Sequence, residues 1–278
     1  MVGRSGRSAS RSGNSSEFVE ALARGLDILR TFGPTALELS VSEVAERTQL
    51  ARPTARRLLL TLEELGYVRA IDGRYSLTTQ VLRLGTAGLA AQGLWEAARP
   101  SMFRLVEHTG ESSSMSQLDG SDIVYTGRVP VAKVIALSVH IGTLFPAVAA
   151  SMGKVLLADL EPDELDALLA MPSRSGITPR VVPTRAELDD ELVLVRERGW
   201  ALADELLSLG IRSVAAPVRD RNGRVACAMN VTVHAGDTSL DRLTDEYLPR
   251  LLEAARSAER DWAEHPNVVD ISLPTGRR

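Results

Sequence analysis

Apolar residues recur at helical spacing three times near the start of the chain. Residues 18–32 carry one stripe, formed by Phe18, Leu22, Leu26 and Leu29. Residues 40–50 and 52–65 carry two more, separated by a short turn. The pattern predicts three short helices that share a core, and the apolar beginning of the first helix also suggests a surface for a partner.

The second and third segments carry the boundary signals of a helix-turn-helix. Ser40 is followed three residues later by Glu43, which is the spacing of a capping box. Pro53 fits only the first turn of a helix, so the third helix is expected to begin near Arg52. Gly66 is expected to end that helix. A stripe of Leu58, Leu59, Leu62 and Leu65 is expected to be its buried side.

The pattern then changes to alternation. Residues 67–71 and 74–77 alternate around Asp72-Gly73, a strong signal for a β-hairpin. A helix-turn-helix followed by a hairpin is the winged form of a DNA-reading fold. The residues expected to contact DNA are Ser42, Arg52, Pro53, Thr54, Arg56, Arg57 and, in the hairpin, Arg74. The alternative is an ordinary helical domain whose arginines are merely solvated.

In the remaining two thirds of the chain, some segments have apolar residues at helical spacing and others alternate as strands do. Residues 77–93 and 94–107 are expected to be helices, the first of them a linker. Strands are predicted at 112–118, 123–129, 134–140, 201–204, 213–220 and 224–233, and helices at 151–160, 162–171, 185–199 and 240–264. Residues 143–150 are expected to form a loop of small residues. The order predicts an α+β domain with a sheet covered by helices on one face or both.

The N-terminal third and the rest of the chain differ in net charge. Residues 1–92 hold twelve arginines, no lysine and nine acids, a net charge of +3, and the remainder holds 20 basic and 27 acidic residues, a net charge of −7. A basic front joined to an acidic back suits a nucleic-acid module attached to a domain that does not bind nucleic acid.

The residues give no reason to expect a metal or a cofactor. Cys227 is the single cysteine, and it lies in an apolar run, where a buried structural role is expected. The four histidines are scattered. No apolar run is long enough to cross a membrane, and the Arg/Ser-rich start lacks the core of a signal peptide. We therefore expect a cytoplasmic protein.

Several separated blocks, in order, carry a family resemblance. The chain from about Phe18 to Glu264 resembles the IclR-type bacterial transcription regulators through LSVSEVAERTQLARPTARRLLLTLEELGYV, FPAVAASMGKVLLA, RERGWALADELLSLGIRSVAAPVRDRNGRV and AMNVTVHA. Its opening FVEALARGLDILRTF and its MNVTVHA block look most like the branch that controls protocatechuate and 4-hydroxybenzoate breakdown.

The resemblance implies a domain plan and partners. It implies a winged helix-turn-helix in residues 17–78, a linker helix in 79–93 and a GAF-like α/β effector-binding domain in 94–264, with tails at 1–16 and 265–278. It implies double-stranded operator DNA as one partner, a small carboxylate effector as another, and assembly as a homodimer or a dimer of dimers. Where relatives usually place a capping residue before the recognition helix, this chain has Ala51, so Thr54 or a phosphate oxygen is expected to supply the acceptor.

One stretch indicates an anion site in the second domain. Ser151 follows small residues and precedes an apolar run, which predicts it as the N-cap of a buried helix whose positive end favours a carboxylate. The resemblance adds pocket positions, so the expected effector-binding residues are Ser151, Met152, Asp204, Ser213, Asn230 and Thr232. The alternative is that Ser151 is an ordinary cap and that Asn230 and Thr232 bond only neighbouring backbone.

We do not expect an enzyme, so no catalytic residue is assigned. Ser151 and Lys154 have the S-x-x-K spacing of penicillin-recognising serine hydrolases, but the companion motifs of that class are absent. A serine hydrolase is the remote alternative. The resemblance implies that the effector is an aromatic acid or an intermediate of the β-ketoadipate pathway, and the nearer alternative is a regulator of the same family that senses a non-aromatic small acid or a sugar acid.

Overall fold

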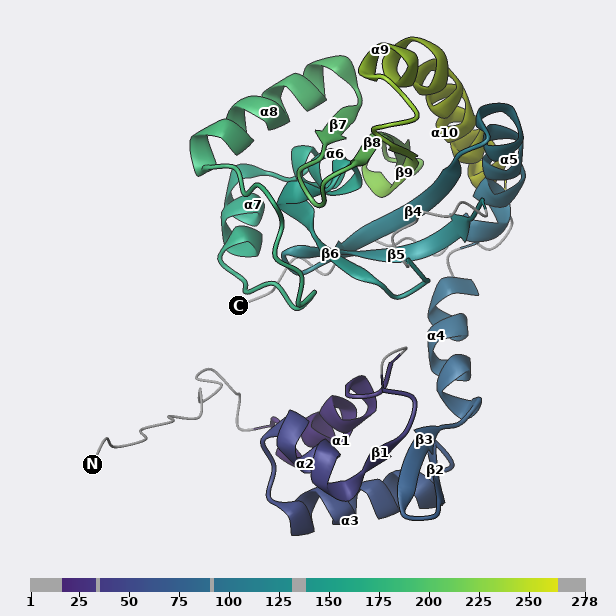
Figure 1. Ribbon diagram of the computed structural model, residues 1–278. Helices are drawn as coiled ribbons and strands as arrows, with labels where there is room; N and C mark the ends of the chain where they lie inside the picture. Colours follow the sequence, from purple (N-terminus) through teal and green to yellow (C-terminus); the bar gives the residue numbers. More distant parts are fainter. Residues whose placement is uncertain (1–16, 34–35, 91–92, 132–138, 265–278) are drawn as a thin grey trace. The chain divides into compact units, whose positions relative to one another are not determined.

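The computed structural model describes residues 17–33, 36–90, 93–131 and 139–264. The chain divides into two compact units between Ala87 and Gly88 (Figure 1).

The N-terminal unit contains three helices and a small sheet. Its elements are α1 (Glu20–Arg30), β1 (Leu39–Ser40), α2 (Val41–Thr48), α3 (Arg52–Glu64), β2 (Val68–Ile71) and β3 (Arg74–Leu77), followed by α4 (Gln80–Ala90). The sheet has the order β1-β3-β2 and is antiparallel. The predicted winged helix-turn-helix is confirmed, and β1 is a strand that the alternation did not reveal.

Local signals explain the boundaries in this unit. The capping box is present, since the Glu43 amide donates to Ser40 Oγ at 3.3 Å and the Ser40 amide donates to a Glu43 carboxylate oxygen at 2.7 Å. Gly66 follows the last residues of α3 with φ +80°. Asp72 and Gly73 both have positive φ, as a tight hairpin turn requires.

Two expectations about the core are wrong. The core of this unit holds Ile28 of α1 and Ala55, Leu59 and Leu62 of α3. Most of the stripe predicted in residues 18–32 lies instead at the surface, with Phe18 41%, Leu22 63% and Leu26 44% exposed, whereas Leu29 packs against the core. Leu65 is also exposed, at 56%. Helical spacing identified the apolar face of the first helix, but only the C-terminal part of that face packs.

The C-terminal unit is an antiparallel sheet with helices on both faces (Figure 1). The strands are β4 (Ser112–Asp119), β5 (Asp122–Val129), β6 (Leu144–Pro146), β7 (Ala201–Asp204), β8 (Ile211–Arg219) and β9 (Val225–His234), in the order β6-β5-β4-β9-β8-β7. The helices are α5 (Leu94–Thr109), α6 (Ser151–Ala158), α7 (Pro162–Leu169), α8 (Arg185–Arg198), α9 (Leu240–Arg242) and α10 (Leu248–Ala263). The predicted α+β fold is confirmed.

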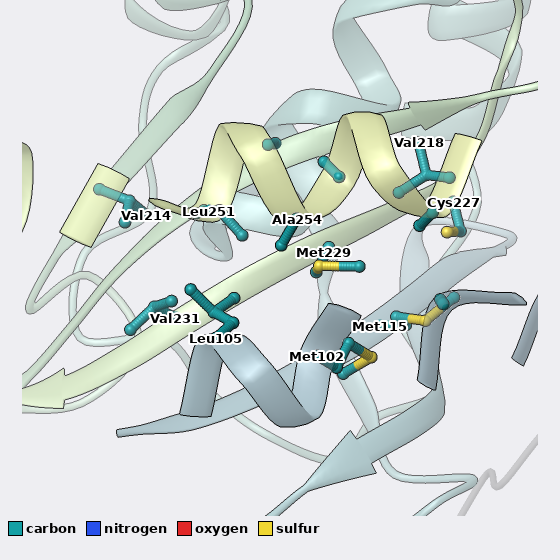
Figure 2. Close-up of a cluster of buried hydrophobic side chains, with 14 of the residues drawn as sticks. Met102, Leu105, Met115, Val214, Val218, Cys227, Met229, Val231, Leu251 and Ala254 are labelled. Atoms are coloured by element: carbon teal, nitrogen blue, oxygen red, sulfur yellow. The ribbon is translucent and has the colours of Figure 1, made fainter. Parts of the chain in front are cut away.

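One face of this sheet, here called the sealed face, packs on α5 and α10. Figure 2 shows its closely packed side chains, among them Met102 of α5, Met115 of β4, Met229 of β9 and Leu251 of α10. All four are at most 1% exposed. Apolar and sulfur-containing side chains fill most of this face, and Ser113 of β4, buried opposite Val231, is a polar residue among them.

Three predictions for this unit need comment. The stretch expected as a loop at 143–150 holds β6 and a 3-10 turn (Ala147–Ala149), because the small side chains allow tight packing. The closing helix is interrupted by a π-helical segment (Leu243–Tyr247) between α9 and α10. Most of the strand predicted at 134–140 lies outside the described residues.

Candidate functional site

The second face of the sheet encloses a cavity under α6 and the loop after β7. This sheet cavity has a volume of about 80 Å³, well above the ~15 Å³ that one water needs. Its polar lining includes Ser112, Arg128, Ser151, Ser213, Asn230 and Thr232. Its apolar lining includes Tyr125, Val139, Phe145, Met152, Leu206 and Leu207. A cavity of this kind suits a small organic molecule with one or two polar groups.

The floor of the sheet cavity is built from two rows of directly opposite residues. In one row Arg128, Ser114 and Asn230 are partners on β5, β4 and β9. In the other row the partners are Ser112, Thr232 and Ser213, on β4, β9 and β8. Opposite residues of neighbouring strands point to the same face, which brings these polar groups together although they are far apart in sequence.

Hydrogen bonds fix the first row. Arg128 Nη1 donates to Ser114 Oγ at 3.1 Å, and the Ser114 amide donates to Asn230 Oδ1 at 3.0 Å. Asn230 Nδ2 donates to Thr232 Oγ1 at 3.0 Å. Asn230 therefore bonds neighbouring backbone, as the plain alternative held, and it also orients the Thr232 hydroxyl beside the cavity.

The prediction that Ser151 caps the buried helix is wrong. Ala150 occupies the N-cap position in an extended conformation, without a side-chain cap, and Ser151 is the first residue of α6. The helix thus begins one residue earlier than a Ser151 cap would require, directly after the 3-10 turn and Ala150. The Ser151 hydroxyl instead pairs with that of Ser213 at 2.8 Å. Ser151 still lines the cavity, now as half of a hydroxyl pair.

Of the other predicted pocket residues, Met152 lines the cavity and Asp204 does not. Asp204 is paired with Arg212, whose Nε lies 2.5 Å from its carboxylate. The structure thus brings together five of the six predicted residues: Ser151, Met152, Ser213, Asn230 and Thr232.

Arg128 is a charged residue among those of the cavity that the sequence did not reveal. A β-bulge places an extra residue, Thr126, between the pairs Ser116–Tyr125 and Met115–Gly127. Simple alternation from Tyr125 would put Arg128 on the opposite face, but the bulge reverses the alternation and Arg128 lines the cavity together with Tyr125. Gly127 packs so closely on Trp95 of α5 that a Cβ would overlap the indole ring. The signal in the sequence was Gly127, since a glycine inside a strand often marks a bulge.

The apolar wall is partly aromatic. Tyr125 and Phe145 pack edge to face, with ring centroids 5.5 Å apart and an interplanar angle of 73°. Burial raises the pKa of Tyr125 to about 12, so its phenol stays neutral at physiological pH. The wall therefore offers flat apolar surface and one uncharged hydroxyl.

The two residues of the hydrolase alternative have separate partners. Lys154 Nζ donates to the Leu202 carbonyl at 3.1 Å and lies 3.8 Å from Glu191. Burial lowers the pKa of Lys154, and the Glu191 charge opposes that shift. The Ser151 hydroxyl bonds Ser213, as described above, so the geometry shows no bond that would activate it as a nucleophile.

The other surface of interest is the beginning of α3. Arg52, Pro53, Arg56 and Arg57 are exposed there, and Thr54 is half-buried. None of the ion pairs formed by the described residues includes these three arginines. Helix α3 has Ala51 as its N-cap and no side-chain cap hydrogen bond, so Thr54 does not supply the missing acceptor. The positive end of α3 and its exposed guanidinium groups together favour phosphate oxygens.

Ser42 and Arg74 are the two predicted DNA contacts outside α3. Ser42 is exposed on α2. The Arg74 guanidinium donates to the Glu38 carbonyl at 2.8 Å and lies 3.3 Å from the Glu43 carboxylate. Hydrogen bonds from Ser40 are the main cause that lowers the pKa of Glu43 to about 2, with Arg74 adding to the effect. A phosphate contact by Arg74 would compete with this internal pair.

Comparison with known proteins identifies the family. The helix-turn-helix model of the IclR regulators matches residues 21–72, and the model of the bacterial transcriptional regulator IclR C-terminal domain matches residues 86–261. The chain belongs to the IclR family of transcription regulators. Within that family, it is 35% identical over 242 residues to the Pca regulon regulatory protein of Pseudomonas putida, covering 86% of this chain and 83% of that protein.

Two further relatives agree with this assignment to the IclR family. The p-hydroxybenzoate hydroxylase transcriptional activator of Acinetobacter baylyi is 30% identical, covering 86% of this chain and 90% of that protein. The crystal structure of a transcriptional regulator from Rhodococcus sp. RHA1 is 43% identical, with a TM-score of 0.76, covering 88% of this chain and 99% of that one. The curated relatives support the protocatechuate branch. In the portion of this IclR-family chain that the structure describes, no helix is long and apolar enough to span a bilayer.

Proposed function

We propose that this IclR-family chain binds operator DNA through α3 and that a small aromatic acid, such as protocatechuate or 4-hydroxybenzoate, binds in the sheet cavity and controls that binding. The observation that carries the proposal is the sheet cavity itself, with hydroxyl, amide and guanidinium groups on its floor and aromatic rings on its wall. The curated relatives include regulators named for the Pca regulon and for p-hydroxybenzoate hydroxylase, which supports an aromatic acid over a sugar acid.

The proposed DNA contact depends on the arginines of α3. The Arg56→Ala, Arg57→Ala double variant should lose specific operator binding, because both side chains are exposed at the recognition helix. If each contacts a phosphate, the slope of log affinity against log salt should fall by about two units in all.

A gel-shift titration across salt concentrations measures both effects. The matched control is Arg24→Ala, Arg30→Ala, which removes the same charge from exposed positions on α1. An equal loss in the control would mean that net charge, not position, governs binding. Unchanged binding of the α3 variant would refute the proposed contact.

We propose a homodimer, or a dimer of dimers, as the DNA-binding form. The exposed stripe of Phe18, Val19, Leu22 and Leu26, which begins just before α1 and continues onto it, is apolar surface that a second copy would cover. Two recognition helices related by a dyad would read half-sites separated by multiples of roughly 34 Å. Sedimentation of the chain with operator DNA should show at least two copies per site, and Leu22→Glu, Leu26→Glu should reduce the assembly; a bound monomer would overturn the proposal.

The control by the acid depends on the sheet cavity. Ser151→Leu places a bulky side chain where a buried hydroxyl now pairs with Ser213, so the variant should bind operator normally without acid and should no longer respond to it. A coupling of about 1–3 kcal/mol between acid and operator is enough for regulation. The matched control, Ser257→Leu on α10, should respond like the wild type.

The same experiment separates a regulator from a hydrolase. Protocatechuate and 4-hydroxybenzoate should be recovered unchanged after incubation with the chain. A full response of Ser151→Leu to the acid would show that the acid binds elsewhere. Turnover of an ester or a lactam that disappears in Ser151→Leu would support the hydrolase alternative instead.

A further inference from the structure

Arg128 stands out among the charged side chains of the sheet cavity. Its guanidinium is half-buried, and its hydrogen bond to Ser114 Oγ at 3.1 Å uses one of its five N–H donors. Among the described residues, no ion pair includes Arg128. A cation removed from water without a counter-charge is costly, so this site would be stabilised by an anion.

The electrostatics of the site support that conclusion. Burial lowers the pKa of Arg128, which reflects the cost of holding a charge there, although an arginine remains protonated under these conditions. The neighbouring Tyr125 is held neutral and does not supply the missing charge. No carboxylate of the described residues forms an ion pair with Arg128, which leaves its guanidinium available to a bound anion.

The other titratable groups of the lining have partners already. Glu111 is buried and has an interaction of its own. His234 accepts a hydrogen bond from the Gly236 amide at Nδ1 and lies 3.9 Å from Asp237. Neither group forms an ion pair with Arg128 within the part of the chain that is described.

The backbone of β5 fixes the direction of the Arg128 side chain. The bulge at Thr126 turns its side chain into the cavity, and the contact of Gly127 with Trp95 fixes β5 from the other face. Ser114, itself tied to Asn230, orients the guanidinium. A planar guanidinium matches a carboxylate with two parallel hydrogen bonds, which is stronger and more directional than a single contact.

We propose that Arg128 binds the carboxylate of the effector, so that the acid lies with its charged end on β5. The opposite end, where an aromatic acid of this class carries its hydroxyl, then faces the hydroxyl pair of Ser151 and Ser213. This assignment rests on the proposed function of the sheet cavity. The contact with the effector's carboxylate is thus assigned to Arg128, and not to the start of α6 where the sequence had placed it.

The test compares an acid with its own primary amide, which keeps the shape and removes the charge. Binding of 4-hydroxybenzoate and 4-hydroxybenzamide to the full chain is measured by calorimetric titration, for the wild type and for Arg128→Gln, Arg128→Lys and the exposed control Arg250→Gln. The wild type and the control should prefer the acid roughly 10- to 100-fold, the range of one charge-assisted bidentate contact. Arg128→Gln should lose that preference by binding the acid more weakly, and Arg128→Lys should keep part of it.

The ratio of acid to amide affinity within one variant does not depend on the fraction of folded protein, so a folding defect cannot imitate the result. An unchanged ratio in Arg128→Gln would overturn the assignment while leaving the sheet cavity as the effector site. Failure of the wild type to bind 4-hydroxybenzoate, protocatechuate and their amides would overturn the proposed function, and the role of Arg128 with it.

Discussion

The two faces of the C-terminal sheet are made by the same strands and have opposite character. On β9, Met229 and Val231 point to the sealed face, and the intervening Asn230 points to the sheet cavity. On β8, Val214 and Ser213 divide in the same way. Alternation thus assigns stability to one set of residues and ligand contact to the neighbouring set. Neighbours in sequence should therefore respond differently to mutation.

The largest expected difference is in stability. Met229→Ala on the sealed face should reduce the free energy of unfolding by about 2–5 kcal/mol, because it leaves a hole in a core that cannot collapse easily. Thr232→Ala, on the same strand but facing the cavity, should cost much less. Urea denaturation of both variants measures the two values, and equal losses would contradict the division between the faces.

A smaller effect on stability is expected at Asn230, whose side chain accepts a hydrogen bond from the backbone of β4. Asn230→Ala removes the acceptor of the Ser114 amide and should cost about 1 kcal/mol, since water entering the cavity can replace the bond. The same variant should weaken acid binding, because Thr232 and Ser114 lose their orientation. A large loss of stability with unchanged acid binding would assign Asn230 to the core instead.

The last difference between the two faces is how readily a thiol reagent reaches a cysteine on each of them. Cys227 lies on the sealed face with no exposed area, and burial raises the pKa of its thiol well above the ordinary range. The native chain should therefore not react with a thiol reagent at neutral pH until it unfolds. A cysteine on the other face, introduced as Thr232→Cys in a Cys227→Ala background, should react and should be protected by a bound acid. Rapid labelling of native Cys227 would show that the face is not sealed.

Structural features that depend on a few consecutive residues were predictable from the sequence. The capping box of Ser40 and Glu43 and the Asp72-Gly73 hairpin each depend on local backbone geometry, and the structure has both. The α+β order of strands and helices also followed from the two periods. The N-cap of α6 did not follow, because the helix includes Ser151 as its first residue and Ala150, directly after the 3-10 turn, takes the cap position.

Features that depend on distant partners were harder to predict. The stripe on α1 was recognised as apolar, but only the packing of Ile28 against α3 shows which side of the helix is inside. The cavity residue Ser151 was predicted from the small and apolar residues around it, whereas Ser213, Asn230 and Thr232 came from the family resemblance. Arg128 escaped both approaches, because its direction depends on where β5 pairs out of step with β4.

The bulge at Thr126 also affects how this chain should be compared with others. On either side of it, odd and even positions of β5 exchange faces, so residues of a related strand that lacks the extra residue cannot be matched by counting from Ile123. An alignment without a gap there would equate Arg128 with a residue on the sealed face. Transfer of ligand specificity between relatives at this strand therefore requires a structural superposition before any residue is exchanged.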